Sequence, residues 1–237
     1  MKLSAPIYVL KQQAKALARE QHVRLHRALD QIARREGFSS WSHLAASWSP
    51  DHLSAALFPQ LQAGDFVLIG ARPAQGKTRL SVGLAIEAMT RGSRAAFFSL
   101  DFTRGDLTRC FARMKHDINQ FADLFLLDTS ENIRADYIVS RMASAAPNTL
   151  VVVDYLQLLD QRRDNPSLMD QARELKQFAM QRQLIVVCLS QISRSYEATS
   201  KRYPDLADVR LPNPLDLSLF NKACFLRDGE MQLTVAA

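Results

Sequence analysis

The chain has 237 residues, which is long enough for one sizeable α/β core with a small appendage. Its 47% hydrophobic and 23% charged residues exclude general disorder, and no apolar run approaches the roughly 20 residues that span a bilayer. The N-terminal apolar stretch is too short for a secretory signal, and three scattered cysteines are expected as free thiols, so we predict a cytoplasmic protein without a membrane partner.

The net charge of +6 is concentrated at one end of the chain. Residues 1–50 hold eight lysines and arginines against three acids, and eight minus three leaves +5. A basic module attached to a nearly neutral body indicates a polyanion partner. A solvated basic face without any partner has the same composition and stays open as the alternative.

Residues 5–48 are predicted to form a small helical unit. Apolar residues recur at steps of three or four, and the expected buried positions are Ile7, Leu10, Ala14, Leu17, Leu25, Ala28, Leu29, Ile32 and Ala33. A third segment, capped by Ser39 or Ser40, covers this hairpin with Trp41, Leu44 and Trp48. Helix–turn–helix DNA binders share the pattern with small helical modules that dock proteins. Residues 49–64 are expected to bridge to the body, and we place the domain boundary at residue 50.

From Asp65 on, strand-like and helix-like segments alternate. Strands are expected at 66–70, 94–100, 124–128, within 149–160 and at 184–190, with helices at 78–92, 103–115, 135–145 and 167–183 between them. A hairpin at 223–235 closes the series. This order predicts a mostly parallel sheet covered by helices on both faces.

A glycine-bearing turn follows the first of these strands. Residues 71–78 read ARPAQGKT, and the phosphate-binding pattern is G-x-x-x-x-G-K-[ST], here with Ala71 at the first glycine position. Backbone N–H groups and the start of the following helix would cradle phosphate oxygens, which Gly76 lets approach closely. Lys77 is expected to neutralise the β- and γ-phosphates, and the Thr78 hydroxyl to bind Mg²⁺. A simple strand–helix turn with a chance Lys-Thr pair is the alternative.

Polar residues end three of the other predicted strands. Asp154 follows a buried apolar run, and a phosphate-bound Mg²⁺ reached through water would be its partner. Asp101 is placed to orient an attacking water and accept its proton, and Gln191 to sense the γ-phosphate. Helix capping by Asp154 and turn formation by the other two are the structural alternatives.

Four segments together resemble the ATPase domain of bacterial replicative helicases of the DnaB type, within the RecA-like class. They are GARPAQGKT, FFSLD, VVVDYLQLL and LSQISRSYEATSKRYPDLADVR. The resemblance runs from about Leu61 to about Asp228, roughly 70% of the chain. It implies a RecA-like P-loop NTPase domain at 51–237, with ATP and Mg²⁺ as ligands and DNA as the partner.

The resemblance also assigns roles to single positions. Lys77, Asp101 and Gln191 are the expected catalytic residues, and Thr78 and Asp154 the metal residues, Asp154 as the Walker B acid. ATP is expected to contact Ala71, Arg72, Pro73, Ala74, Gln75, Gly76, Lys77, Thr78 and Arg79. In this family, loops after the fourth and fifth strands hold single-stranded DNA; here they contain Arg162, Arg163, Arg194, Lys201 and Arg202, with Tyr196 and Tyr203 placed to stack on bases.

The sequence departs from the family at three places. Asp101 stands where the family has a catalytic glutamate, so its carboxylate is one methylene shorter. No segment after residues 225–233 matches the strands that carry the family's arginine finger. The basic helical unit stands where the family has another N-terminal domain and a linker helix, so ring assembly through that linker is not expected.

Two functions follow from these observations. The first is an ATP-hydrolysing, replicative-helicase-like protein acting on DNA, either a DNA helicase or a DNA-dependent ATPase. The alternative is a nucleotide-dependent switch, loader or regulator that binds ATP with little hydrolysis and no unwinding. Single-stranded DNA is the expected partner in the first case, and self-assembly and a protein partner at residues 5–48 stay open.

Overall fold

The computed structural model describes residues 3–5, 7–47, 51–160 and 165–235. The first three helices are α1 (Ile7–Glu20), α2 (Leu25–Arg35) and α3 (Trp41–Ser47), as predicted. They share a core of their own, made by Leu10, Ala14, Leu17, Ala28, Ile32, Ala33 and Leu44. None of the described helices has the length and apolar character that would span a bilayer.

The side chains of this three-helix unit can be compared with the predicted burial pattern. The Ser40 hydroxyl caps α3 by accepting a hydrogen bond from the His43 backbone N–H at 3.1 Å. The expectation for Leu25 is wrong, because it is the first residue of α2 and stays 43% exposed, ahead of the buried stripe that begins at Ala28. The expected burial of Ile7 and Trp48 lies outside the described side chains.

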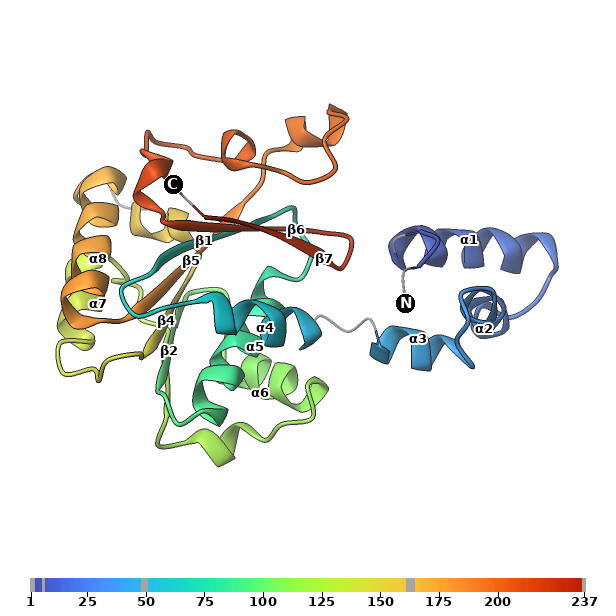
Figure 1. Cartoon of the computed structure of the whole chain (residues 1–237), viewed down its shortest axis with the longest axis horizontal. Coiled ribbons are helices and arrows are strands. Elements are labelled where there is room, and N and C mark those ends of the chain that lie inside the picture. The colour runs from blue at the N-terminus through green and yellow to red at the C-terminus, as the bar shows by residue number, and fades with distance from the viewer. Residues whose placement is uncertain (1–2, 6, 48–50, 161–164, 236–237) are drawn as a thin grey trace.

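A seven-stranded sheet forms the body, in the order β3-β2-β4-β5-β1-β6-β7 (Figure 1). The strands are β1 (Phe66–Ala71), β2 (Ala95–Ser99), β3 (Phe125–Asp128), β4 (Leu150–Asp154), β5 (Ile185–Gln191), β6 (Lys222–Arg227) and β7 (Glu230–Val235). Neighbouring strands run parallel except β6 and β7, which form an antiparallel hairpin. Its turn holds Asp228 and Gly229 with φ of 55° and 84°, the positive values that a tight Asp-Gly hairpin turn requires.

Helices cover both faces of the sheet, which confirms the predicted fold class. One face packs against α4 (Asp51–Leu57), α5 (Lys77–Thr90) and α6 (Arg104–Arg113), the other against α7 (Ala135–Arg141) and α8 (Leu168–Arg182). Short 3₁₀ turns occupy 58–60, 118–121, 156–160, 194–198, 206–208 and 217–219. Residues alternate along each strand, so that Val67 and Ile69 join one core layer while Phe66 and Leu68 join the other.

The helix α4 lies in the segment that the sequence analysis treats as a bridge. It packs directly on α5, where Gly83 has no side chain in the way. A Cβ atom at Gly83 would lie 2.6 Å from the Ser54 hydroxyl oxygen, so glycine is what allows the two helices to approach. The bridge is therefore part of the body's core.

The three cysteines are free, as expected. Cys188 and Cys224 are buried within β5 and β6, whereas Cys110 on α6 is half-exposed. Burial raises the pKa of the Cys224 thiol to about 12 and also raises the pKa of Cys188. Both buried thiols therefore stay protonated and unreactive at neutral pH.

Candidate functional site

The carboxyl ends of β1, β4 and β5 meet at one edge of the sheet, because these strands are parallel and adjacent in the order β4-β5-β1. The loop of residues 72–76 leaves β1 there and turns into α5 at Lys77. Gly76 caps this helix with φ +91°, a left-handed conformation that glycine adopts without strain. The helix therefore directs its free N–H groups and the positive end of its dipole at this edge.

The Lys77 side chain lies over the loop of residues 72–76. Its ammonium donates a hydrogen bond to the Ala71 carbonyl oxygen at 3.1 Å, which folds the side chain back over the loop. Burial lowers the pKa of Lys77, the Asp154 carboxylate opposes that shift, and the nearby Arg72 guanidinium adds to it. The positive charge is thus held in a partly desolvated position next to an acid.

Asp154 ends β4 and is 5% exposed. Its carboxyl group accepts a hydrogen bond from the Thr78 hydroxyl, and its Oδ2 atom is buried without a hydrogen-bond partner among the described residues. Burial raises the pKa of Asp154 to about 7; the Asp101 carboxylate adds to the shift, and Lys77 and Thr78 oppose it. The structure therefore brings Lys77, Thr78 and Asp154 together around one unsatisfied buried oxygen.

Asp101 and Gln191 lie beside the cluster of Lys77, Thr78 and Asp154 and not within it. Asp101 follows β2, is exposed, and donates its backbone N–H to the Ser99 hydroxyl at 3.2 Å. Gln191 ends β5 in register with Ala71, and its side-chain oxygen lies 3.5 Å from the Arg210 guanidinium. The structure thus places Asp101 within electrostatic range of Asp154, and Gln191 beside the start of the loop.

Two loop residues, Arg72 and Gln75, hold other segments of the chain. Arg72 forms an ion pair with Glu197 at 2.7 Å and donates to the Ile192 carbonyl oxygen at 2.9 Å. The Gln75 side-chain oxygen accepts the Asp228 backbone N–H at 2.7 Å. The loop, the 194–198 turn and the β6–β7 turn together line a pocket of about 370 Å³.

The other residues predicted to contact ATP differ in how far they are exposed. Pro73 and Ala74 are exposed, and Ala74 has a positive φ of 63°, which is uncommon outside glycine. Arg79 lies half-buried in the first turn of α5. Ala71 is fully buried as the last residue of β1, so its side chain faces the core and only its backbone reaches the site.

Gln157 is a site residue that the sequence analysis does not single out. Its amide nitrogen donates to the Ser190 hydroxyl at 2.9 Å and to the Arg210 carbonyl oxygen at 2.7 Å. Its Oε1 atom is buried without a partner among the described residues. The signal was its position three residues after Asp154 in the DYLQL motif, which puts a second polar side chain at the same strand end.

The predicted nucleic-acid residues are only partly available for an anion. Lys201 pairs with Asp205 at 2.8 Å and Asp208 at 3.0 Å, and Arg202 pairs with Glu230 at 3.1 Å. Arg194 is exposed and has no partner among the described residues, while Arg162 and Arg163 lie outside the described residues.

The expectation that two tyrosines of this loop stack on bases does not fit their contacts. Tyr196 is 5% exposed, and its hydroxyl accepts a hydrogen bond from Arg227 at 2.7 Å, so base stacking by Tyr196 is wrong. The Tyr203 hydroxyl donates to Glu230 at 2.6 Å, and the Arg202 guanidinium lies over its ring, 5.3 Å from the centroid. The ring face of Tyr203 on that side is therefore already covered.

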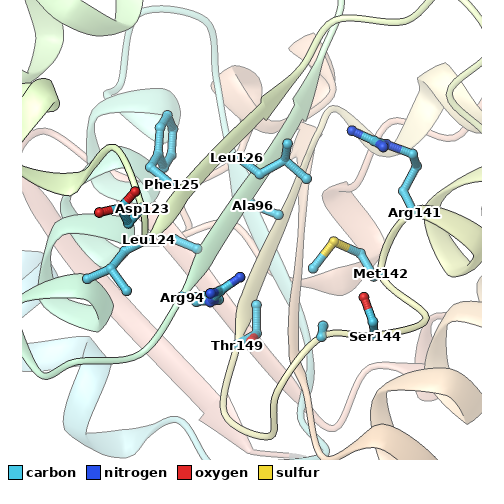
Figure 2. Close-up of a pocket in the computed structure, with 12 residues that line it drawn as sticks. Arg94, Ala96, Asp123, Leu124, Phe125, Leu126, Arg141, Met142, Ser144 and Thr149 are labelled. Atoms are coloured by element: carbon cyan, nitrogen blue, oxygen red, sulfur yellow. The ribbon is translucent and has the colours of Figure 1, made fainter.

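A second cavity, of about 320 Å³, lies at the opposite edge of the sheet, where β2 and β3 begin. Figure 2 shows Arg94, Asp123 and Arg141 around it, with Phe125 and Leu126 of β3. None of the predicted site residues lines this cavity. The site described above is therefore confined to the carboxyl edge of the sheet.

A glycine-bearing loop after β1, and a buried carboxylate that ends β4 two places away in the sheet, are the arrangement that the resemblance to RecA-like P-loop proteins predicts. Residues 111–213 match the family described as "DnaB-like helicase C terminal domain". A probable plasmid replicative DNA helicase of Chlamydia trachomatis is 30% identical over 181 residues, which are 63% of this chain and 40% of that protein. The chain thus spans two fifths of the length of this relative.

Two solved structures share the fold. One, titled as an ATPase domain, superposes with a TM-score of 0.56 at 21% identity, covering 74% of this chain and 77% of that one. A structure titled as a DnaB-like replicative helicase and its interactions with primase gives a TM-score of 0.62 at 18% identity, covering 97% and 70%. The two structures show the same fold, and the family match together with the sequence relative confirms the resemblance to DnaB-type replicative helicase ATPase domains.

Proposed function

We propose that this protein binds ATP with Mg²⁺ at the carboxyl edge of the sheet and hydrolyses it while acting on DNA. The observation that supports this most is the meeting of Lys77, Thr78 and Asp154 around the unpartnered buried Oδ2 atom. Native proteins rarely leave a buried carboxylate oxygen unpaired, so this position fits a cation supplied from outside the chain. A hydroxyl and a carboxylate are the oxygen ligands that Mg²⁺ prefers.

Each side chain has a task in this proposal. The N–H groups at the start of α5 and the Lys77 ammonium hold the phosphates, while Thr78 and Asp154 hold Mg²⁺, directly or through water. The metal supplies charge neutralisation on the phosphate oxygens when bound. Asp101 orients the attacking water and accepts its proton, and Gln191 contacts the γ-phosphate from the end of β5.

The proposal extends to partners and location. Arg194, Lys201 and Arg202, with Arg162 and Arg163, would contact single-stranded DNA, which requires Lys201 and Arg202 to exchange their present carboxylate partners for phosphates. We further propose a cytoplasmic protein that self-assembles on DNA, organised as a basic helical unit at 1–50 and an ATPase domain at 51–237. Duplex unwinding by the whole protein is part of this proposal.

A second function, a nucleotide switch with little turnover, is favoured by one observation. Asp101 is exposed, and no hydrogen bond fixes its carboxylate among the described residues. An unoriented base with a shorter side chain accelerates hydrolysis less than a positioned one. Binding of ATP would then be kept while the chemical step is slow.

Phosphate release measured with and without single-stranded DNA separates the two functions. The ATPase proposal requires DNA-stimulated turnover that Lys77→Ala abolishes, while Lys176→Ala on α8, outside the site, leaves it unchanged. Asp101→Glu, which lengthens the base by one methylene, should then raise the rate. Tight ATP binding without turnover in the wild-type protein and in Asp101→Glu would establish the switch instead.

A further inference from the structure

A basic surface lies on the three-helix unit, outside the site already described. Every described lysine and arginine side chain of α1 and α2, with Arg24 just before α2, is exposed, and none forms an ion pair among the described residues: Lys11, Lys15, Arg19, Arg24, Arg27, Arg34 and Arg35. In the body, by contrast, Lys201, Arg202 and Lys222 are each bound to carboxylates. The cations of the three-helix unit therefore remain without carboxylate partners among the described residues.

The three acids of this unit leave it with a net charge of +5, and two of them hold backbone groups and not cations. The Asp30 carboxylate accepts the Trp41 backbone N–H at 2.8 Å and so fixes the start of α3. The Glu36 carboxylate accepts the Ser4 backbone N–H at 2.7 Å. Only Glu20, at the end of α1, is left among the acids of residues 1–50.

The cations are arranged in rows. On α2, Arg27 and Arg34 are seven residues apart and lie on one side of the helix, opposite its buried stripe of Ala28, Ile32 and Ala33, and Arg24 stands just before its first turn. On α1, Lys11, Lys15 and Arg19 repeat at every fourth residue. At 1.5 Å of rise per residue, these rows extend for roughly 10 to 12 Å. A rigid row of this kind presents several charges at fixed spacings.

The side chains of this surface indicate which kind of partner it binds. Protein interfaces have apolar and aromatic centres, yet Leu25 is the one exposed large apolar side chain in the described part of the unit. Surfaces that bind single strands combine cations with exposed aromatic rings, whereas Phe38 and Trp41 pack here against the unit's own core. Cations without apolar or aromatic neighbours fit a regular phosphate backbone.

We propose that the three-helix unit is a second DNA-binding site, which contacts the phosphate backbone of double-stranded DNA through the arginine row of α2 and the lysine-arginine row of α1. It makes no base contacts that specify sequence. The site is separate from the nucleotide site and needs no ATP. It would keep the ATPase domain on duplex DNA next to the strand on which that domain acts.

The test is binding of the full chain to a labelled 30-base-pair duplex, followed by fluorescence anisotropy without nucleotide at several KCl concentrations. The combined variant Arg24→Ala, Arg27→Ala and Arg34→Ala should weaken binding at 0.1 M salt at least about tenfold, because each phosphate contact contributes roughly 0.9 to the slope of log K against log salt. That slope should fall by about 2 to 3.

Two matched variants control this result. Removing Arg94, Arg113 and Arg182, three exposed arginines of the body, takes away the same charge and should change the affinity less than about twofold. Replacing Arg24, Arg27 and Arg34 by lysine keeps the charge and should retain binding within a few-fold, which shows that charge and not misfolding is measured.

Equal losses in the two alanine triples would overturn the proposal, as would wild-type affinity in the α2 triple. A single-stranded 30-mer that binds more tightly than the duplex would overturn the choice of double-stranded DNA. The Lys77→Ala variant keeps this test independent of the proposed ATPase: it should lose ATP binding and bind the duplex as the wild type does.

Discussion

The buried carboxyl group of Asp154 is proposed to bind Mg²⁺, yet in the metal-free protein it should lower the free energy of unfolding. The substitution Asp154→Asn keeps the shape of the side chain and removes its ability to ionise. Because the wild-type carboxylate is desolvated and close to Asp101, ionising it costs free energy in the folded state. The asparagine variant is spared that cost and should be the more stable protein above neutral pH.

The magnitude follows from the pKa. The carboxyl group titrates at about 7 when folded and has a reference pKa of 3.8, so between these values the folded state binds more protons. The free energy of unfolding therefore falls as pH rises from about 4 through 7. With 1.36 kcal/mol per pKa unit, this group removes about 2 to 3 kcal/mol of wild-type stability between pH 5 and pH 8. The asparagine variant does not lose this stability as the pH rises.

Urea unfolding in EDTA, followed by far-UV circular dichroism, measures the effect. Fluorescence is unsuitable because both tryptophans, Trp41 and Trp48, precede the body. The stability of Asp154→Asn minus that of the wild type should rise by about 2 to 3 kcal/mol from pH 5 to pH 8. Asp101→Asn, which removes the second cause of the raised pKa, should reduce the pH dependence. A difference between Asp154→Asn and the wild type that is constant with pH would refute the reasoning.

Three further substitutions probe the loop and its surroundings. Gly76→Ala should destabilise the protein by roughly 1 to 2 kcal/mol in urea unfolding, because its φ of +91° is strained for alanine although no atom lies within 4 Å of the added Cβ. Gly70→Ala should cost about 1 to 3 kcal/mol in the same assay, since its Cβ would lie 2.9 Å from the Phe225 ring, and Phe225→Leu should recover part of that loss. Arg72→Ala should change stability by less than about 1 kcal/mol, because Glu197 is largely exposed, yet limited proteolysis should cut residues 194–204 faster than in the wild type. An unchanged cleavage rate would show that this ion pair does not hold the loop.

Much of the fold follows from short-range patterns. Runs such as FVLIG and VVVD are apolar on both faces, which only a strand covered on both sides tolerates, and each is followed by a helical period. Lys77 was identified from the phosphate-binding pattern of residues 71–78, and Asp154 because a charged residue at the end of a buried strand needs a partner. The sequence signal and the structural position coincide at these residues.

Other features depend on contacts between distant segments, which no local pattern encodes. The helix α4 is seven residues long, about two turns, and its burial depends on the glycine that α5 presents to it. Tyr196 looks like a loop aromatic in the sequence. It is buried because Arg227, 31 residues further on, binds its hydroxyl. The strand order is likewise set by packing and not by chain order.

Two buried oxygens without hydrogen-bond partners connect the stability of the fold with ligand binding at this edge of the sheet. Among the described buried side chains, the oxygens without a hydrogen-bond partner are Asp154 Oδ2 and Gln157 Oε1, three residues apart after β4. Each costs roughly 1 to 3 kcal/mol while unpaired, so their shared location is unfavourable for the isolated chain. A cation or donor from a ligand would offset both costs, and binding would then stabilise the fold in proportion to ligand concentration. Mg²⁺ with ATP should therefore raise the stability of the wild type far more than that of Asp154→Asn, the reverse of their order in EDTA at pH 8.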